Sequence, residues 1–207
     1  DTQDDYERVL ESHFAISWFQ YKSDCEGDET INLGTIWITG LSGSGKTTLG
    51  TSLYNALGKL GINNLELLDG DETRKRLPSN FGYSTEDRQA VGMLVANLAL
   101  ESNKKGNIAI VCAISHVRKV RLNIREILAP NFIEVYLDCP VDICADRDVK
   151  GHYRKALAGH YDNFVGITEP YQISDNPELV LDTVNKTSTE CADILLNYTL
   201  KFFTLGK

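Results

Sequence analysis

The chain has 207 residues, of which 42% are apolar and 24% are charged, a composition typical of one globular domain with a buried core. Its formal net charge of −8 argues against sequence-independent binding to nucleic acid, which requires a basic surface. No apolar run approaches the ~18 residues that a membrane span needs, and the acidic N-terminus does not resemble a secretory signal, so we predict a cytoplasmic protein with no membrane partner.

Residues 1–33 differ from the rest of the chain. They are acidic, and aromatic residues precede the polar stretch SDCEGDET. We interpret them as an appended segment that docks a short helix or strand on this domain or on a partner subunit, and we place the main domain over residues 34–207. The segment contains Cys25, one of five scattered cysteines that form no CxxC pair. Reduced thiols are the favoured state, and a redox-regulatory pair that includes Cys25 is the alternative.

From residue 35 onward, short apolar and β-branched runs alternate with amphipathic stretches. Strands are expected over residues 35–39, 64–68, 107–113, 132–138 and 178–182. Helices are expected up to about residue 60, over about 84–105, over a basic stretch after the third strand, and from about 187 to 203. Ser84 with Asp87 is the expected capping pair of the 84–105 helix, and Gly106 its stop. This alternation predicts an α/β fold with a parallel sheet flanked by helices.

A glycine-rich stretch, GLSGSGKTT, lies between the first strand and the first helix and fits the pattern G-x-x-x-x-G-K-[ST]. Its glycines let backbone N–H groups turn toward phosphate oxygens, and the N-terminus of the following helix adds partial positive charge. Lys46 would reach the β- and γ-phosphates of ATP, and the Thr47 hydroxyl would ligate Mg²⁺. We therefore predict a P-loop NTPase-type domain whose nucleotide site comprises Gly40, Ser42, Gly43, Ser44, Gly45, Lys46, Thr47 and Thr48.

Carboxylates follow the second strand in the sequence Asp69-Gly70-Asp71. The carboxyl ends of parallel strands form the mouth at which open α/β folds bind ligands. Asp71 could orient or deprotonate an attacking hydroxyl there, or bind metal-held water, and the alternative is a helix cap. Arg88, Arg118 and Arg121 follow, and their pattern suggests a confined pocket for an anion, although each could also be a solvated surface charge.

Residues 147–164 are rich in Lys, Arg, Gly and Tyr and have no clean period. Such a segment fits a lid that closes over ATP and excludes water, which prevents wasteful hydrolysis in a kinase. A plain surface loop is the alternative.

Together these motifs resemble the adenylylsulfate (APS) kinase family over about residues 34–203. The matching stretches are GLSGSGKTT (40–48), LDGDETR (68–74), FGYSTEDR (81–88), ISHVRKVR (114–121), RDVKGHYRKALAG (147–159), FVGI (164–167) and PELVLDT (177–183). The lid stretch is unusually specific, because generic P-loop kinases lack it. The resemblance implies an ATP-Mg-dependent kinase that phosphorylates the ribose 3′-hydroxyl of adenosine 5′-phosphosulfate, and a homodimer.

The resemblance also implies roles on the acceptor side. Asp71 would be the carboxylate beside the acceptor 3′-hydroxyl, and Arg74 and Arg88 would hold the phosphosulfate group. Tyr83, where the family has Phe, would sandwich the acceptor base with Phe164.

Further roles follow for the loop after the third strand and for the lid. Ile114 would contact the base through its backbone, and Ser115 matches the serine that some members phosphorylate. Lys150 would reach the ATP phosphates, and Arg147 would pack near the donor adenine. The expected catalytic groups are Lys46, Asp71 and Lys150.

The chain departs from the family pattern on the acceptor side, at Glu72, Val91, Ala113, His116, Val117 and Val165. Loss of an amide that would hydrogen-bond the acceptor can cost orders of magnitude in selectivity. Two alternatives to an APS kinase therefore stay open: a kinase of another nucleotide, such as cytidine diphosphoramidate in capsule synthesis, or a regulatory P-loop module that binds nucleotide and transfers little.

Overall fold

The structure, a computed structural model, describes residues 33–75, 82–148 and 150–204. The predicted N-terminal segment, apart from its last residue, and Cys25 lie outside the described residues. The helices and strands expected from residue 35 onward fall within them.

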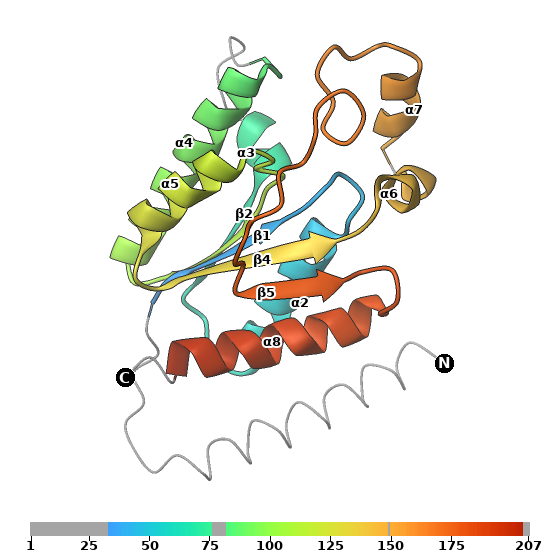
Figure 1. The fold of residues 1–207 in the computed structure, drawn as a ribbon. Helices are drawn as coiled ribbons and strands as arrows, with labels where there is room; N and C mark the ends of the chain where they lie inside the picture. Colours follow the sequence, from blue (N-terminus) through green and yellow to red (C-terminus); the bar gives the residue numbers. More distant parts are fainter. Residues whose placement is uncertain (1–32, 76–81, 149, 205–207) are drawn as a thin grey trace.

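A parallel sheet forms the centre of the molecule. Its strands in the described ranges are β1 (Thr35–Thr39), β2 (Leu65–Asp69), β3 (Ile108–Cys112), β4 (Phe132–Asp138) and β5 (Leu179–Asp182). Their order is β2-β3-β1-β4-β5, and every neighbouring pair is parallel (Figure 1). The α/β prediction is confirmed. Because β1 lies at the middle of this order, the chain leaves its carboxyl end between β3 and β4, where the crossovers diverge and ligands bind.

Helices cover both faces of the sheet. They are α2 (Lys46–Lys59), α3 (Gly70–Lys75), α4 (Thr85–Lys104), α5 (Arg118–Leu128), α6 (Val141–Arg147), α7 (His152–Leu157) and α8 (Ser188–Thr204). Figure 1 shows α4 and α5 on one face and α2 and α8 on the other. The short helices α6 and α7 were not predicted from the sequence, because one or two turns are too short to show a helical period. None of the helices in the described ranges is long and apolar enough to span a bilayer.

Local signals explain where the longer helices begin. The Ser84 hydroxyl oxygen accepts a hydrogen bond from the Asp87 amide at 3.1 Å, and the Ser84 hydroxyl donates to the Asp87 carboxylate at 2.9 Å, so the predicted cap of α4 is confirmed. Gly106 follows the C-terminus of α4 with a φ of 88°. At the start of α8, Thr187 and Glu190 form a reciprocal capping box, with the Glu190 amide donating to the Thr187 hydroxyl at 3.2 Å.

The apolar core has three parts. One lies between the sheet and α2 and α8, and a second lies between the sheet and α4 and α5, where Trp37 is fully buried. The third is smaller and lies under the glycine-rich loop, where Leu41 packs with Cys144, Tyr153 and Val165. This third cluster joins the loop after β1 to α6 and α7 and so fixes the wall of the site described next.

Candidate active site

The predicted site residues gather where β1, β2 and β3 end. The glycine-rich loop continues β1, Asp69 is the last residue of β2, and Ala113 follows β3. The lid helix α7 packs above the loop through the third cluster. Residues far apart in the sequence therefore line one mouth of the sheet, as the parallel topology requires.

The glycine-rich loop needs glycine at two of its positions for distinct reasons. Gly45 has a φ of 102° and directly precedes α2, a conformation that side-chain-bearing residues rarely adopt. Gly43 has a φ of 77°, and a Cβ there would lie 2.8 Å from the Cys144 carbonyl oxygen. The loop can thus turn tightly into the helix and sit against α6.

Three consecutive carbonyls of the loop are held by side chains. The Leu41 carbonyl accepts from Lys46 Nζ at 2.6 Å, the Ser42 carbonyl from the Tyr153 hydroxyl at 2.9 Å, and the Gly43 carbonyl from Arg147 at 3.4 Å. These contacts use carbonyl groups only, so they fix the curve of the loop without consuming its N–H groups. Amides held in such a curve ahead of a helix N-terminus form an anion-binding concavity.

Lys46 has an unusual protonation equilibrium. Burial lowers the pKa of Lys46 to about 8, and the nearby carboxylates of Asp71 and Asp69 oppose a larger fall. Its ammonium group lies on the Leu41 carbonyl in this structure, so it must turn to reach a phosphate chain. Next to it in the loop, Ser44 is fully buried and its hydroxyl lacks a hydrogen-bond partner among the described residues.

Asp69 has two roles that the sequence analysis did not assign. One oxygen accepts from the Thr47 hydroxyl at 2.7 Å. The other accepts from the amides of Asp71 and Glu72 at 2.9 and 3.2 Å, so Asp69 and not Asp71 caps α3. The signal was its place as the last residue of a strand in the Asp-Gly-Asp motif.

Thr47 and Asp69 fit a magnesium site. They present two oxygen donors in contact beside the phosphate-binding loop, the type of ligand that Mg²⁺ prefers. The described residues hold no cluster of three or more His, Cys, Asp or Glu able to bind a metal by themselves. Mg²⁺ in kinases does not require one, because substrate phosphates and waters supply the remaining ligands.

Asp71 forms an ion pair with the lid. Its Oδ2 lies 2.5 Å from Lys150 Nζ, and both side chains are more than half exposed. Burial would raise the pKa of Asp71, but the hydrogen bond and charge of Lys150, with the charge of Lys46, hold that pKa below its usual value. The same hydrogen bond raises the pKa of Lys150. The two groups are therefore fully charged at neutral pH.

Arg74 and Arg88 share one aromatic partner, Tyr83. The guanidinium carbons lie 4.5 Å and 5.4 Å from the centroid of the Tyr83 ring, which is 61% exposed. Arg74 donates to the Gly82 carbonyl at 2.5 Å, and Arg88 donates to the Tyr83 carbonyl at 3.0 Å. Burial lowers the pKa of Arg88, and the charge of Arg74 adds to this effect. Two cations are thus concentrated at the entrance to α4.

Phe164 approaches this region from the returning lid. Its ring stacks on Tyr161 with centroids 5.8 Å apart and meets the edge of Tyr153 at 4.9 Å. The preceding carbonyl, of Asn163, accepts from Arg88 at 3.0 Å. Arg88 therefore links the segments that carry Tyr83 and Phe164. Binding of a base between these two rings stays a prediction.

The loop after β3 is held at each predicted position. The Ile114 carbonyl accepts from the Thr39 hydroxyl at 2.6 Å, so that oxygen is already engaged. Ser115 has a φ of 42°, a left-handed conformation that costs a serine free energy, and its carbonyl accepts from Arg121 at 2.5 Å. Such strain often marks a functional site.

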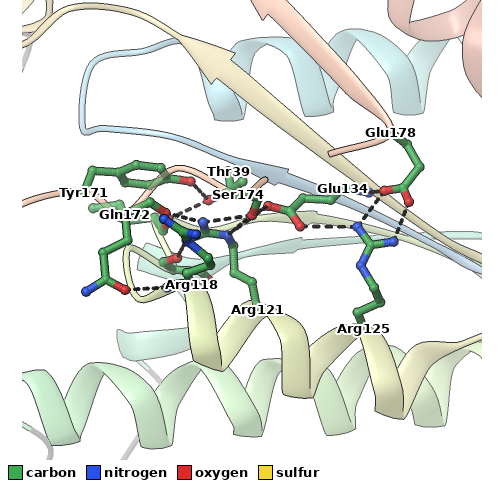
Figure 2. Close-up of polar contacts among 11 residues, drawn as sticks. Thr39, Arg118, Arg121, Arg125, Glu134, Tyr171, Gln172, Ser174 and Glu178 are labelled. Atoms are coloured by element: carbon green, nitrogen blue, oxygen red, sulfur yellow. Dashed lines mark hydrogen bonds and ion pairs between the residues drawn. The ribbon is translucent and has the colours of Figure 1, made fainter. Parts of the chain in front are cut away.

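Two predicted anion-pocket residues bind protein groups instead. Arg121 is 1% exposed and pairs with Glu134 at 2.9 Å (Figure 2). Arg118 pairs with Asp175 at the surface at 2.6 Å. Arg121 is therefore not available to an anion pocket, whereas Arg118 agrees with the alternative interpretation of a surface charge. Glu134 and Asp175 neutralise them across 13 and 57 residues of sequence, a separation that single-sequence analysis does not bridge.

Arg147 spans the far side of the loop. It donates to the Gly43 carbonyl and to the Thr183 carbonyl, the latter at 2.6 Å. This places it between the phosphate-binding loop and the segment after β5, and its packing on a donor adenine stays a prediction. Thr48 is exposed in the first turn of α2.

A profile of the adenylylsulphate kinase family matches residues 33–182 of the chain. The chain belongs to the adenylylsulphate kinase family. Individual relatives agree. The adenylyl-sulfate kinase of Synechococcus sp. (strain JA-3-3Ab) is 41% identical over 162 residues, which are 78% of this chain and 91% of the relative. That of Clostridium kluyveri is 39% identical over 186 residues, or 88% and 93% of the two chains.

A solved member of the adenylylsulphate kinase family has the same fold. The APS kinase of Mycobacterium tuberculosis, in a complex with AMPPNP and APS, is 34% identical, with a TM-score of 0.77. The comparison covers 82% of this chain and 98% of the other. The resemblance inferred from the motifs is therefore confirmed, and the chain is a kinase of this family.

Several departures from the family pattern are absorbed by packing. Val91 and Val165 are 7% and 2% exposed and lie in apolar clusters, while Glu72 pairs with Lys75 at the surface. Ala113 also packs at the edge of the α4–α5 cluster, and Val117 is the half-buried residue before α5. Apart from Glu72, these side chains are engaged in the packing of the fold.

His116 is the departure with a polar partner near the acceptor motif. Its Nε2 lies 3.1 Å from Glu169, whose other oxygen accepts from the Thr85 hydroxyl at 2.8 Å. Burial lowers the pKa of His116, and Glu169 opposes that fall. Glu169, which the sequence analysis did not single out, thus links the segment after residues 147–164 to α4 and to the loop after β3.

Proposed function

We propose that the protein transfers the γ-phosphoryl group of ATP to the 3′-hydroxyl of adenosine 5′-phosphosulfate, giving 3′-phosphoadenosine 5′-phosphosulfate. The observation that carries this proposal is the ion pair of Asp71 with Lys150, beside Asp69, which contacts Thr47 at the end of the glycine-rich loop. A carboxylate beside a phosphate-binding loop fits a hydroxyl acceptor, and the two cations at the entrance to α4 fit an anionic tail on that acceptor.

On the donor side, the loop amides and Lys46 would hold the phosphate chain of ATP. Lys46 would leave the Leu41 carbonyl for the β- and γ-phosphates, and the pKa of Lys46, about 8, leaves it largely protonated at neutral pH. Thr47 and Asp69 would hold Mg²⁺, which offsets phosphate charge when bound. Arg147 would pack near the adenine of ATP.

On the acceptor side, Asp71 would orient the 3′-hydroxyl and accept its proton as the new P–O bond forms. Its lowered pKa keeps it ionised but makes it a weak base. A weak base suffices, because phosphoryl transfer of this kind depends mainly on positioning and charge stabilisation. Lys150, paired with Asp71 here, would supply positive charge to the transferring group when the lid closes.

Arg74 and Arg88 would bind the phosphosulfate, and Tyr83 and Phe164 would contact the adenine. The two guanidinium groups offer charge-assisted hydrogen bonds to an anion. Ile114 would contact the adenine through its backbone, in the loop where Ser115 has a φ of 42°. We propose a homodimer and a cytoplasmic location as well; the described cysteines, Cys112, Cys139, Cys144 and Cys191, are free and buried, in keeping with reduced thiols.

One assay tests the acceptor and the two alternatives together. The protein is incubated with ATP-Mg and, in separate reactions, adenosine 5′-phosphosulfate, cytidine diphosphoramidate or no acceptor, and ADP is measured. We expect acceptor-dependent release of ADP only in the reaction that contains adenosine 5′-phosphosulfate. ADP with the cytidine compound alone would replace the proposed acceptor, and tight ATP binding without acceptor-dependent ADP would identify a regulatory module. Light scattering on the same sample gives the mass of the assembly and tests the dimer.

A further inference from the structure

The segment that leads from the lid to β5 is bound along its length by the arginines of α5. We call residues 171–178 the strap. Arg118 binds Asp175, Arg121 binds the Gln172 carbonyl and the Ser174 hydroxyl, and Arg125 binds Glu178. Figure 2 shows the three arginines reaching from one face of α5 toward the strap and Glu134. Spacings of three and four residues place them on the same side of the helix.

Arg121 is the centre of this network. Its Nε donates to Glu134 at 2.9 Å and its Nη2 to Ser174 at 2.9 Å, while its guanidinium lies 5.0 Å from the centroid of the Tyr171 ring. Arg121 and Glu134 are 1% and 3% exposed. One side chain thus binds β4, the strap and, through the Ser115 carbonyl, the loop after β3.

The loop after β3 is held through three consecutive carbonyls. Ile114 is held by Thr39, whose hydroxyl also bonds the Tyr171 hydroxyl at 2.8 Å. Ser115 is held by Arg121, and the His116 carbonyl accepts from the Gln172 amide at 2.9 Å. Every one of these anchors is either part of the strap or bound to it.

A buried ion pair is a weak source of stability, because removing both charges from water costs about as much as their attraction returns. What an arginine offers here is geometry, since its planar group presents five donors in fixed directions. The Ser115 conformation, at a φ of 42°, is costly for serine and persists only where its surroundings impose it. Arg121 supplies the side-chain contact to the carbonyl of this residue.

We propose that Arg121, paired with Glu134, is a positioning residue that shapes the acceptor side of the active site by fixing Ser115 and the strap. The expected effect on acceptor binding rests on the proposed function. The donor loop has its own anchors, in Tyr153 and Arg147, and does not depend on Arg121. Loss of Arg121 therefore weakens acceptor binding and leaves nucleotide binding intact.

The test uses the full chain with Arg121→Met and Glu134→Leu combined. Replacing both charges with apolar groups of similar size often preserves stability, whereas removing Glu134 alone leaves the buried charge of Arg121 without its carboxylate, and removing Arg121 alone leaves Glu134 with Arg125 at 3.3 Å. We expect the KM for adenosine 5′-phosphosulfate to rise about tenfold or more, the effect of losing roughly one hydrogen-bonded anchor, with the Kd for AMPPNP changed less than about twofold. Hydrogen exchange without substrates should accelerate at residues 113–117 and remain unchanged at residues 40–49.

The matched control is Asp175→Asn, which removes an exposed ion pair between the same helix and the same strap and should leave both constants unchanged. Should the double variant not fold, Arg121→Lys keeps the charge beside Glu134 but cannot reach all three segments, and the same acceptor-specific defect is expected. An unchanged acceptor KM with unchanged exchange at residues 113–117 overturns the proposal, as does an equal loss of AMPPNP binding. If the unaltered protein does not act on adenosine 5′-phosphosulfate, the proposed function fails, and the exchange comparison alone still decides the role of Arg121.

Discussion

Lys46 is the residue whose charge should change within the ordinary range of assay pH. Burial lowers its pKa from 10.5 to about 8, so the unliganded protein loses this positive charge as pH rises through about 8. Bound phosphates favour the protonated form, and binding above that pH must therefore take up a proton. We expect the Kd for AMPPNP to be constant from about pH 7 to 7.5 and then to weaken, approaching tenfold per pH unit.

Calorimetric titrations at several pH values, in buffers of different ionisation enthalpy, measure both the Kd and the proton uptake. The variant Lys46→Met should bind AMPPNP weakly at every pH and take up no such proton. A Kd for the unaltered protein that stays constant between pH 7 and 9 would contradict the assignment of Lys46.

Asp71 should matter for turnover more than for nucleotide binding. Its carboxylate faces Lys150 across the site, so Asp71→Asn removes the proton acceptor with little change in shape. We expect kcat to fall by about 10²- to 10⁴-fold, the usual contribution of a general base, while AMPPNP still binds. Steady-state ADP release with adenosine 5′-phosphosulfate measures this. The control is Asp175→Asn, which removes an exposed carboxylate paired with Arg118; an equal fall in kcat there would show that the loss at Asp71 is not specific to its position.

At the scale of elements, the contact between α2 and β3 determines how closely the phosphate-binding helix sits on the sheet. A Cβ at Gly50 would lie 2.3 Å from Cys112 Sγ, whereas a Cβ at Gly58, in the last turn of the same helix, would meet nothing within 4 Å. We expect Gly50→Ala to destabilise the protein by about 1–3 kcal/mol through overpacking. Gly58→Ala should stabilise it by about 0.5–1 kcal/mol, because alanine loses less backbone entropy in a helix.

Urea unfolding of the two variants gives the two free energies of unfolding, and their signs should be opposite. Adding Cys112→Ala to Gly50→Ala should recover much of the loss, because the clashing sulfur is removed. If Gly50→Ala were as stable as Gly58→Ala, the close approach of α2 to β3 would be wrong.

The whole molecule offers a test of the predicted domain boundary. Among the described residues, three apolar clusters pack against the sheet, and helices cover both of its faces. We propose that residues 34–207 fold by themselves, so removing residues 1–33 should shift Tm by less than about 4 °C, equivalent to about 1 kcal/mol for a domain of this size. Thermal unfolding measures the shift, and loss of the cooperative transition would assign residues 1–33 to the fold itself.

Local signals in the sequence were sufficient for most of the architecture. The strands were predicted from continuous apolar runs such as TIWIT, and α4 from its capping pair Ser84–Asp87, because both patterns are complete within a few residues. Helices α6 and α7 were missed because each is too short to show a period. The burial of Arg121 was not foreseen because its partner Glu134 lies in another element, 13 residues away in the sequence.

The sequence by itself determined the family, the parallel α/β fold and the phosphate-binding loop, since each depends on neighbouring residues or on motifs with fixed spacing. Only the tertiary structure decided that Asp69 caps α3 and contacts Thr47, that Lys150 reaches Asp71, and that Arg121 is buried behind Ser115. The physical reason is that an ionisable side chain has no assigned role until its partner, its burial and its distance are known, and these are set by segments brought together across the sheet.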